Sequence, residues 1–166
     1  GCTKTDQVVV TVFPGNVGAD FSGNTIICNG QSTTITVTGK NGTSPYTYTW
    51  SNSLGSGATK TVSPSTTTTY TVTVVDNNGC TGTGQVTVTV NPTPNVNAGA
   101  DVEICTGNST TLTAVGSGGT PGFTYLWNNN AGNTASVTVS PTTTTTYTVT
   151  VTDSKGCTKT DAVTVT

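Results

Sequence analysis

The chain has 166 residues; about a quarter are Thr, 7% are charged, and the formal net charge is −2. With five Lys, no Arg and no His, the composition provides no basic surface for nucleic acid and few groups for metal or acid–base chemistry. No apolar run approaches the roughly 18 residues that a membrane-spanning helix needs.

Val and Thr, which both favour strands, dominate the chain, and the low net charge argues against disorder. We therefore expect a folded, all-β, extracellular protein. No secretory signal peptide is visible after Gly1, so the chain is interpreted as a mature fragment.

An internal repeat organises the sequence. The hexapeptide Gly1–Asp6 returns unchanged at Gly156–Asp161, and a degenerate copy begins at Gly79. The two Trp residues are about 77 positions apart, which indicates two copies of one unit in a tandem array. The predicted organisation is a closing strand of a preceding repeat at 1–13, followed by two repeats at 14–91 and 92–166, with Pro-containing junctions between them.

Within each repeat, apolar residues alternate with Thr at period two, which predicts short strands. Trp50 and Tyr70 in the first repeat, and Trp127 and Tyr147 in the second, fall on the apolar faces and are predicted core aromatics. Six or seven short strands with regular turns and a buried Trp favour a β-sandwich of immunoglobulin type. The predicted strands lie near 25–28, 33–38, 45–50, 59–63, 68–76 and 84–90, then near 102–105, 110–115, 123–127, 134–140, 144–152 and 160–166.

A resemblance to a known family rests on a succession of motifs in the second repeat. They are Ala100–Cys105, Ser109–Ala114, Phe123–Trp127, Val139–Thr142, Tyr147–Asp153 and Gly156–Cys157. This succession resembles the immunoglobulin-like and polycystic-kidney-disease-like repeats of giant bacterial surface proteins. The closest are gliding-adhesin-type repeats of proteins exported by the type IX secretion system. The resemblance implies tandem immunoglobulin-like β-sandwich domains that act mostly as spacers, with neighbouring repeats as partners and no cofactor.

The five cysteines recur with the repeat. Cys28 and Cys80 are 52 positions apart, as are Cys105 and Cys157, which predicts one disulfide within each repeat and pairing of Cys2 with a preceding domain. Links of Cys2 to Cys28 and of Cys80 to Cys105 are equally periodic, but we disfavour them because each cysteine lies about 11 residues from its junction. One tension remains: a seven-strand sandwich, unlike a six-strand one, would place the two cysteines of a repeat toward opposite ends.

The Thr-rich faces and the scarcity of charge raise the question of what keeps the surface soluble. We predict O-linked glycan on exposed strand faces, with candidates Thr71, Thr73, Thr148 and Thr150. The alternatives are that Thr is a neutral strand residue, that the faces are buried in a polymer, or that they bind ice.

Two further interpretations concern single residues. Asp76 and Asp153 are predicted turn formers rather than Ca²⁺ ligands, because each turn offers one carboxylate. No metal site is predicted, and the absence of a His base argues against catalysis.

The function expected from the sequence is a non-catalytic segment of an extracellular surface stalk, adhesin or filament. The alternative is a carbohydrate-binding module, which would need its aromatic side chains exposed. The burial of four residues separates the two hypotheses: Tyr46, Tyr48, Phe123 and Tyr125.

Residues 3–12 match the closing strands of the two repeats, and the first repeat already has its own. We therefore expect them to lie outside the first sandwich. They would complete a preceding domain of a continuous array, which we favour, or add as a strand to a neighbouring subunit.

Overall fold

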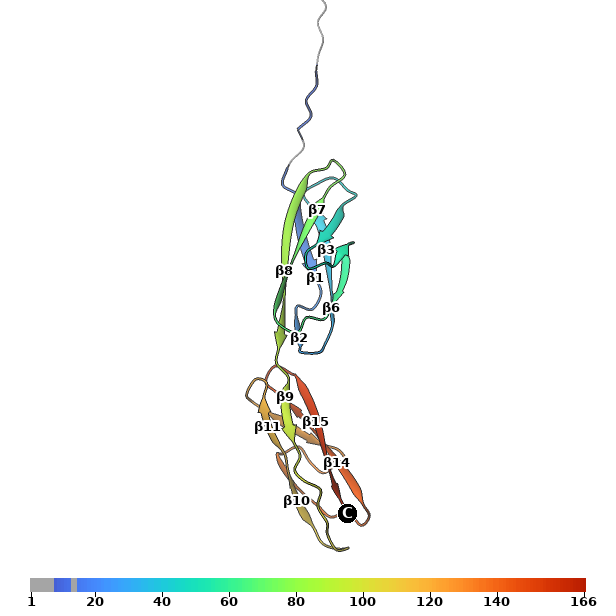
Figure 1. The fold of residues 1–166 in the computed structure, drawn as a ribbon, viewed down its shortest axis with the longest axis vertical. Helices are drawn as coiled ribbons and strands as arrows, with labels where there is room; N and C mark the ends of the chain where they lie inside the picture. Colours follow the sequence, from blue (N-terminus) through green and yellow to red (C-terminus); the bar gives the residue numbers. More distant parts are fainter. Residues whose placement is uncertain (1–7, 13–14) are drawn as a thin grey trace, which may run out of the picture. The chain divides into compact units, whose positions relative to one another are not determined.

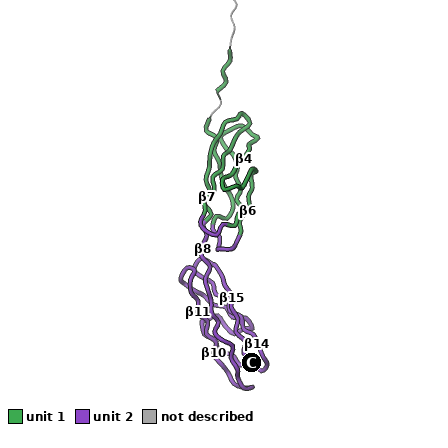
Figure 2. The backbone as a smooth tube through the Cα atoms, in the orientation of Figure 1, with its two compact units in different colours: residues 1–25, 32–63, 68–88 green, residues 26–31, 64–67, 89–166 purple. Residues whose placement is uncertain are grey.

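The computed structural model describes residues 8–12 and 15–166, and all the regular elements in them are β-strands. The described residues form two compact units, coloured separately in Figure 2. The second unit comprises Thr89–Thr166 together with Ile26–Gln31 and Pro64–Thr67, and the first contains the rest. No helix in the described part of the chain is long and apolar enough to cross a membrane.

The first repeat folds into two facing sheets. One has the strand order β1-β3-β6, and the other has the order β2-β8-β7-β4-β5. The neighbours are antiparallel except β2 and β8, which run parallel. The strands are β1 (Gly18–Ser22), β2 (Ile26–Cys28), β3 (Thr33–Lys40), β4 (Thr47–Trp50), β5 (Gly55–Ser56), β6 (Thr59–Val62), β7 (Thr68–Val75) and β8 (Thr81–Asn91) (Figure 1).

The period-two pattern determines which side chains form the core of the first repeat. Tyr70, Val72 and Val74 of β7 point inward and are at most 5% exposed, while Thr73 between them is exposed. Trp50 of β4 meets Phe21 of β1 edge-on, with ring centroids 6.1 Å apart. This contact joins the two sheets across the core.

The second repeat has the same arrangement of strands, but its strands form smaller sheets. A single parallel bridge from Val102 to Val165 takes the place of the β2–β8 pairing. Its buried core includes Trp127 and Tyr147. Its strands are β9 (Pro94–Asn97) with β11 (Val115–Gly118), β10 (Thr110–Thr113) with β13 (Ser136–Val139), and β12 (Thr124–Trp127), β14 (Thr145–Thr152) and β15 (Thr158–Val165) in one sheet (Figure 1).

The all-β, immunoglobulin-like fold is as predicted, but the six-strand count is wrong. The first strand of each repeat, β1 or β9, was not predicted, because its short sequence has few β-branched residues. Strand β5 also lies in 51–58, where no strand was counted. With these strands included, the segment carrying Cys28 runs parallel to the last strand of its repeat.

Residues 8–12 form no strand, and Val8, Val10 and Val12 are at least 78% exposed. They therefore do not pack beside Val86 and Val88, which lie in the first core. Residues 3–7, which complete this predicted closing strand, are outside the described residues, as is Cys2.

Substituting Val72→Ala tests the core of the first repeat. Val72 is fully buried and pairs with Trp50 in the sheet register, so the loss of its methyl groups should lower the free energy of unfolding by about 2 kcal/mol. Urea unfolding followed by Trp fluorescence measures the change. The matched control Thr73→Ala, on the exposed face, should change it by less than about 0.5 kcal/mol; equal effects would contradict the placement of the core.

Candidate functional site

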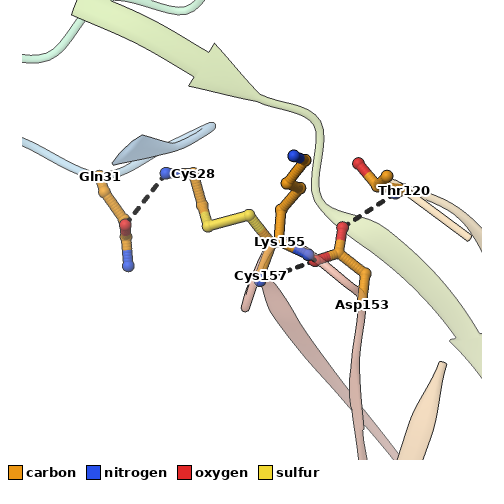
Figure 3. Close-up of a disulfide and its surroundings, with 6 residues drawn as sticks. All are labelled: Cys28, Gln31, Thr120, Asp153, Lys155 and Cys157. Carbon is orange, nitrogen blue, oxygen red and sulfur yellow. Dashed lines mark hydrogen bonds between the residues drawn. A yellow bond between two sulfur atoms is a disulfide. The ribbon is translucent and has the colours of Figure 1, made fainter. Parts of the chain in front are cut away.

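The turn between β14 and β15 is built around a buried carboxylate. Asp153 is 4% exposed, and its Oδ1 accepts hydrogen bonds from the backbone N–H groups of Lys155 and Cys157, both at 2.9 Å. Its Oδ2 accepts a third hydrogen bond, also at 2.9 Å, from the backbone N–H of Thr120, which lies 33 residues earlier in the chain (Figure 3). The carboxylate thus fixes the backbone at Cys157 and ties this turn to a second loop.

The equivalent turn of the first repeat has the same construction. Asp76 is 6% exposed and accepts backbone N–H groups from Thr43, Asn78 and Cys80 at 2.8–2.9 Å. Among the described residues, no group of three or more His, Cys, Asp or Glu side chains could hold a metal ion. The three backbone hydrogen bonds that each carboxylate accepts give it a structural role in its turn.

Hydrogen bonding lowers the pKa of both carboxyl groups. The backbone N–H of Thr43 is the main cause at Asp76, and that of Thr120 is the main cause at Asp153. Burial acts in the opposite direction, while the remaining backbone N–H donors lower the pKa further. Both groups are held in the ionised form that the turn requires.

Cys28 occupies a different kind of position, at the end of a strand. In the parallel β2–β8 pairing, Cys28 lies opposite Asn91, the last residue of β8. The N–H of Asn29 donates to the carbonyl of Asn91 at 2.9 Å. A turn then closes with the N–H of Gln31 on the Cys28 carbonyl at 3.0 Å, while the Cys28 N–H donates to the Gln31 side chain at 3.1 Å (Figure 3).

Cys28 and Cys157 form a disulfide, with Cα atoms 5.6 Å apart (Figure 3). They are separated by 129 residues, and both lie in the second compact unit. Cys157 is completely buried. In sequence terms, the bond joins a cysteine of the first repeat to one of the second.

The predicted disulfides Cys28–Cys80 and Cys105–Cys157 are therefore wrong: Cys28 and Cys157 bond to each other, and Cys80 and Cys105 are free. The reason is the length of β8, which begins next to Cys80 and ends opposite Cys28. An 11-residue strand spans roughly 33 Å, far beyond the roughly 7 Å Cα limit of a disulfide. The parallel arrangement of an early strand with the last strand, which the sequence left open, is the one that separates these cysteines.

The four aromatic residues that separate the two functional hypotheses are all half-buried. The hydroxyl groups of the three Tyr residues bond to backbone groups: Tyr48 accepts the Gly39 N–H at 3.0 Å, Tyr125 accepts the Gly116 N–H at 3.2 Å, and Tyr46 donates to the Gly42 carbonyl at 2.8 Å. A Cβ at Gly39 would lie 2.5 Å from the Tyr46 ring, so this ring rests directly on the strand. Phe123, the remaining residue, covers Gly116 in the same way.

The predicted core aromatics Trp50, Tyr70, Trp127 and Tyr147 are all at most 6% exposed. Each indole N–H has a backbone acceptor, Gly57 at 2.8 Å for Trp50 and Thr134 at 3.1 Å for Trp127.

Of the glycan candidates, Thr73 is exposed, while Thr71, Thr148 and Thr150 are half-buried. Elsewhere on the outer faces, Thr hydroxyls pair across neighbouring strands at 2.8–3.4 Å. The pairs are Thr34–Thr61, Thr36–Thr59, Thr69–Thr87, Thr111–Thr138 and Thr146–Thr164.

Comparison with protein families identifies the first repeat. Residues 18–92 match the family described as "Ig-like domain CHU_C associated". No curated protein sequence matches the chain. Residues 18–92 therefore fold as an immunoglobulin-like domain that is similar to this family, and the second repeat has the same fold.

Solved structures with a similar fold are immunoglobulin-domain proteins of low identity. The first two Ig domains of DIP-gamma are 13% identical, with 89% of this chain and 96% of that chain covered and a TM-score of 0.41. The N-terminal eight Ig domains of Down syndrome cell adhesion molecule are 13% identical over 90% of this chain and 24% of that one, with a TM-score of 0.49. The insect immune protein hemolin is 16% identical over 88% and 45%, with a TM-score of 0.46.

The carboxylate-centred turns predict a loss of stability in acid. Because the folded-state pKa of Asp153 lies below its unfolded value, its contribution is complete above about pH 4 and is lost as the pH falls through the folded pKa. Urea midpoints measured across the acid range should therefore fall below about pH 4. Asp153→Asn should flatten this decline, whereas Ser154→Ala, an exposed neighbour, should leave it unchanged; an equally steep decline in Asp153→Asn would contradict this role.

Removing the disulfide should destabilise the second unit. By chain entropy alone, a link across 129 residues stabilises by up to about 5 kcal/mol, so Cys28→Ser should lower the free energy of unfolding by an amount within that limit. Chemical unfolding under oxidising conditions measures the loss, with Cys105→Ser, at an exposed free thiol, as the control. Non-reducing peptide mapping that recovers Cys28 linked to Cys80 would contradict the assignment.

Proposed function

We propose that this chain is a non-catalytic, load-bearing segment of an extracellular tandem-repeat surface stalk, adhesin or filament. The observation that carries the proposal is the disulfide between Cys28 of the first repeat and Cys157 of the second. A spacer domain needs only its own core, whereas a bond between cysteines of successive repeats also limits how far the repeats can be drawn apart.

The position of the bond suits a mechanical role. Strands β3 to β14 all lie between Cys28 and Cys157, so a force applied to the two chain ends passes through the disulfide and bypasses them. Of the strands in the described residues, only β1, β2 and β15 lie on the path of the force. Most of both cores is therefore protected from being extended, even if the strands separate.

The same bond supports an extracellular location, because disulfides persist in oxidising compartments. The resemblance to type IX-exported surface repeats supports this location and suggests the export route.

The Thr-rich outer faces are proposed to carry O-linked glycan, with Thr73 as the most accessible of the four candidates. The support is the composition, because 7% charged residues is well below the roughly 25–35% usual for soluble surfaces. Mass spectrometry of the proteolytic peptides that carry these Thr residues, prepared from protein of the native source, should give masses above those of the bare peptides. Masses equal to those of the bare peptides would remove this part of the proposal.

Carbohydrate binding is the second candidate. A shallow hollow of about 390 Å³ is lined by residues that include Tyr46 and Tyr48. Tyr46 and Tyr48 use their hydroxyl groups in backbone hydrogen bonds and are half-buried, which leaves less aromatic surface for stacking on a sugar. The mechanical role therefore has the stronger support.

Single-molecule pulling tests the proposed function. With the disulfide intact, the 129-residue segment between Cys28 and Cys157 cannot extend, so reduction should add on the order of 450 Å of contour length to complete unfolding. Cys28→Ser should give the long extension without reductant, whereas Cys105→Ser should behave like the unaltered chain. Equal contour lengths with and without reductant would contradict the proposal.

A further inference from the structure

The cysteine at the corresponding strand end of the second repeat is free and exposed. Cys105 is followed by the same turn as Cys28, closed by the N–H of Asn108 on the Cys105 carbonyl at 3.0 Å. The preceding residue, Ile104, donates its N–H to the carbonyl of Thr166 at 2.8 Å, next to the parallel bridge from Val102 to Val165. Cys105 therefore repeats the local geometry of Cys28.

The cysteine at the corresponding turn of the first repeat is also free. Cys80 donates its N–H to Asp76 Oδ1 at 2.8 Å, as Cys157 does to Asp153 at 2.9 Å. Its carbonyl accepts the Asp76 N–H at 3.0 Å, again as in the second repeat. The chain thus contains each half of the Cys28–Cys157 site twice, once bonded and once free.

A hollow beside Cys105 provides a second, independent observation. It measures about 250 Å³ and is lined by Ile104, Thr106, Pro141–Thr144 and Thr166. Their counterparts one repeat earlier are Ile27, Asn29, Pro64–Thr67 and Thr89, and all of these belong to the compact unit formed by the second repeat. The first repeat thus contributes this surface to the second compact unit. The equivalent surface of the second repeat is the one that contains the hollow.

We propose that Cys105 and Cys80 are the two unfilled halves of the same covalent junction, and that their partner is another copy of this repeat. Cys105 bonds the turn cysteine of the repeat that follows it, and Cys80 bonds the strand-end cysteine of the repeat that precedes it. The direction is fixed because a strand-end cysteine bonds the turn cysteine of the next repeat, as Cys28 does. This inference rests on the proposed tandem-array function and extends it to a disulfide at every junction.

The bond forms by thiol–disulfide exchange with a disulfide oxidant such as oxidised glutathione. One thiolate attacks the oxidant, forms a mixed disulfide and releases one thiol. The second thiolate then displaces the other half of the oxidant. In total, the two cysteines lose two protons and two electrons, and the oxidant becomes two thiols.

A fused chain tests the inference. Residues 1–166 are followed directly by residues 12–166 of a second copy, because Thr11 is the counterpart of Thr166 and the repeat register then continues unbroken. The chain is refolded in oxidised and reduced glutathione, its free thiols are alkylated, and its disulfides are mapped by non-reducing digestion and mass spectrometry. In the fused chain, Cys105 of the first copy should bond Cys80 of the second, at a separation close to the 129 residues between Cys28 and Cys157.

Alkylation of Cys105 in the first copy should therefore be lost on fusion, while Cys80 of the first copy and Cys105 of the second should stay reactive. Cys105→Ser in the first copy should expose one new thiol, at Cys80 of the second copy, and leave both Cys28–Cys157 bonds intact. A reactive Cys105, or Cys105 bonded to any other cysteine, overturns the inference while the proposed function stands if the Cys28–Cys157 bonds are present. If those bonds are also missing, both the inference and the proposed function fail.

Discussion

The parallel pairing of β2 with the end of β8 is the constraint on which the rest of the structure depends. It places the strand-end cysteine at the end of β8, while the turn cysteine precedes the start of the same strand. A sandwich built this way cannot close a disulfide between its own two cysteines, because the strand between them is longer than any disulfide can span. In the proposed array, the two cysteines of one repeat therefore bond to two different neighbouring repeats.

Among the described residues, the two buried charged side chains, Asp76 and Asp153, each stabilise a turn that presents a cysteine. Asp76 and Asp153 are buried, yet all of their hydrogen bonds come from backbone N–H groups, so their ionised forms have donors in place of water. On the outer faces, cross-strand Thr pairs satisfy one another without charge. Val-rich cores thus stabilise the inner faces of the sheets, and neutral Thr hydroxyl pairs link the strands on the outer faces. This accounts for a stable fold with so few charged residues.

Periodicity alone predicted the long strands and the burial of Trp50 and Tyr147, since alternation at period two fixes which face a side chain takes. It missed β1 and β9, because a first strand such as Gly18–Ser22 is short and is stabilised by its pairing with β3 rather than by its own propensity. The disulfide could not be predicted from spacing, because equal spacing in two repeats is compatible with any pairing that respects the repeat. The choice depends on strand direction, which is a tertiary property. Likewise, the sequence indicates a turn at Asp153, but it does not indicate the hydrogen bond that the backbone N–H of Thr120, 33 residues away, donates to the Asp153 carboxylate.

The central claim is that one disulfide joins cysteines of successive repeats, and a crystal structure of the oxidised chain, with anomalous scattering to locate the sulfur atoms, tests it most directly. The account predicts continuous density between the Sγ atoms of Cys28 and Cys157, with Cys80 a free thiol in its Asp76-centred turn. Density joining Cys28 to Cys80, or Cys105 to Cys157, would contradict it.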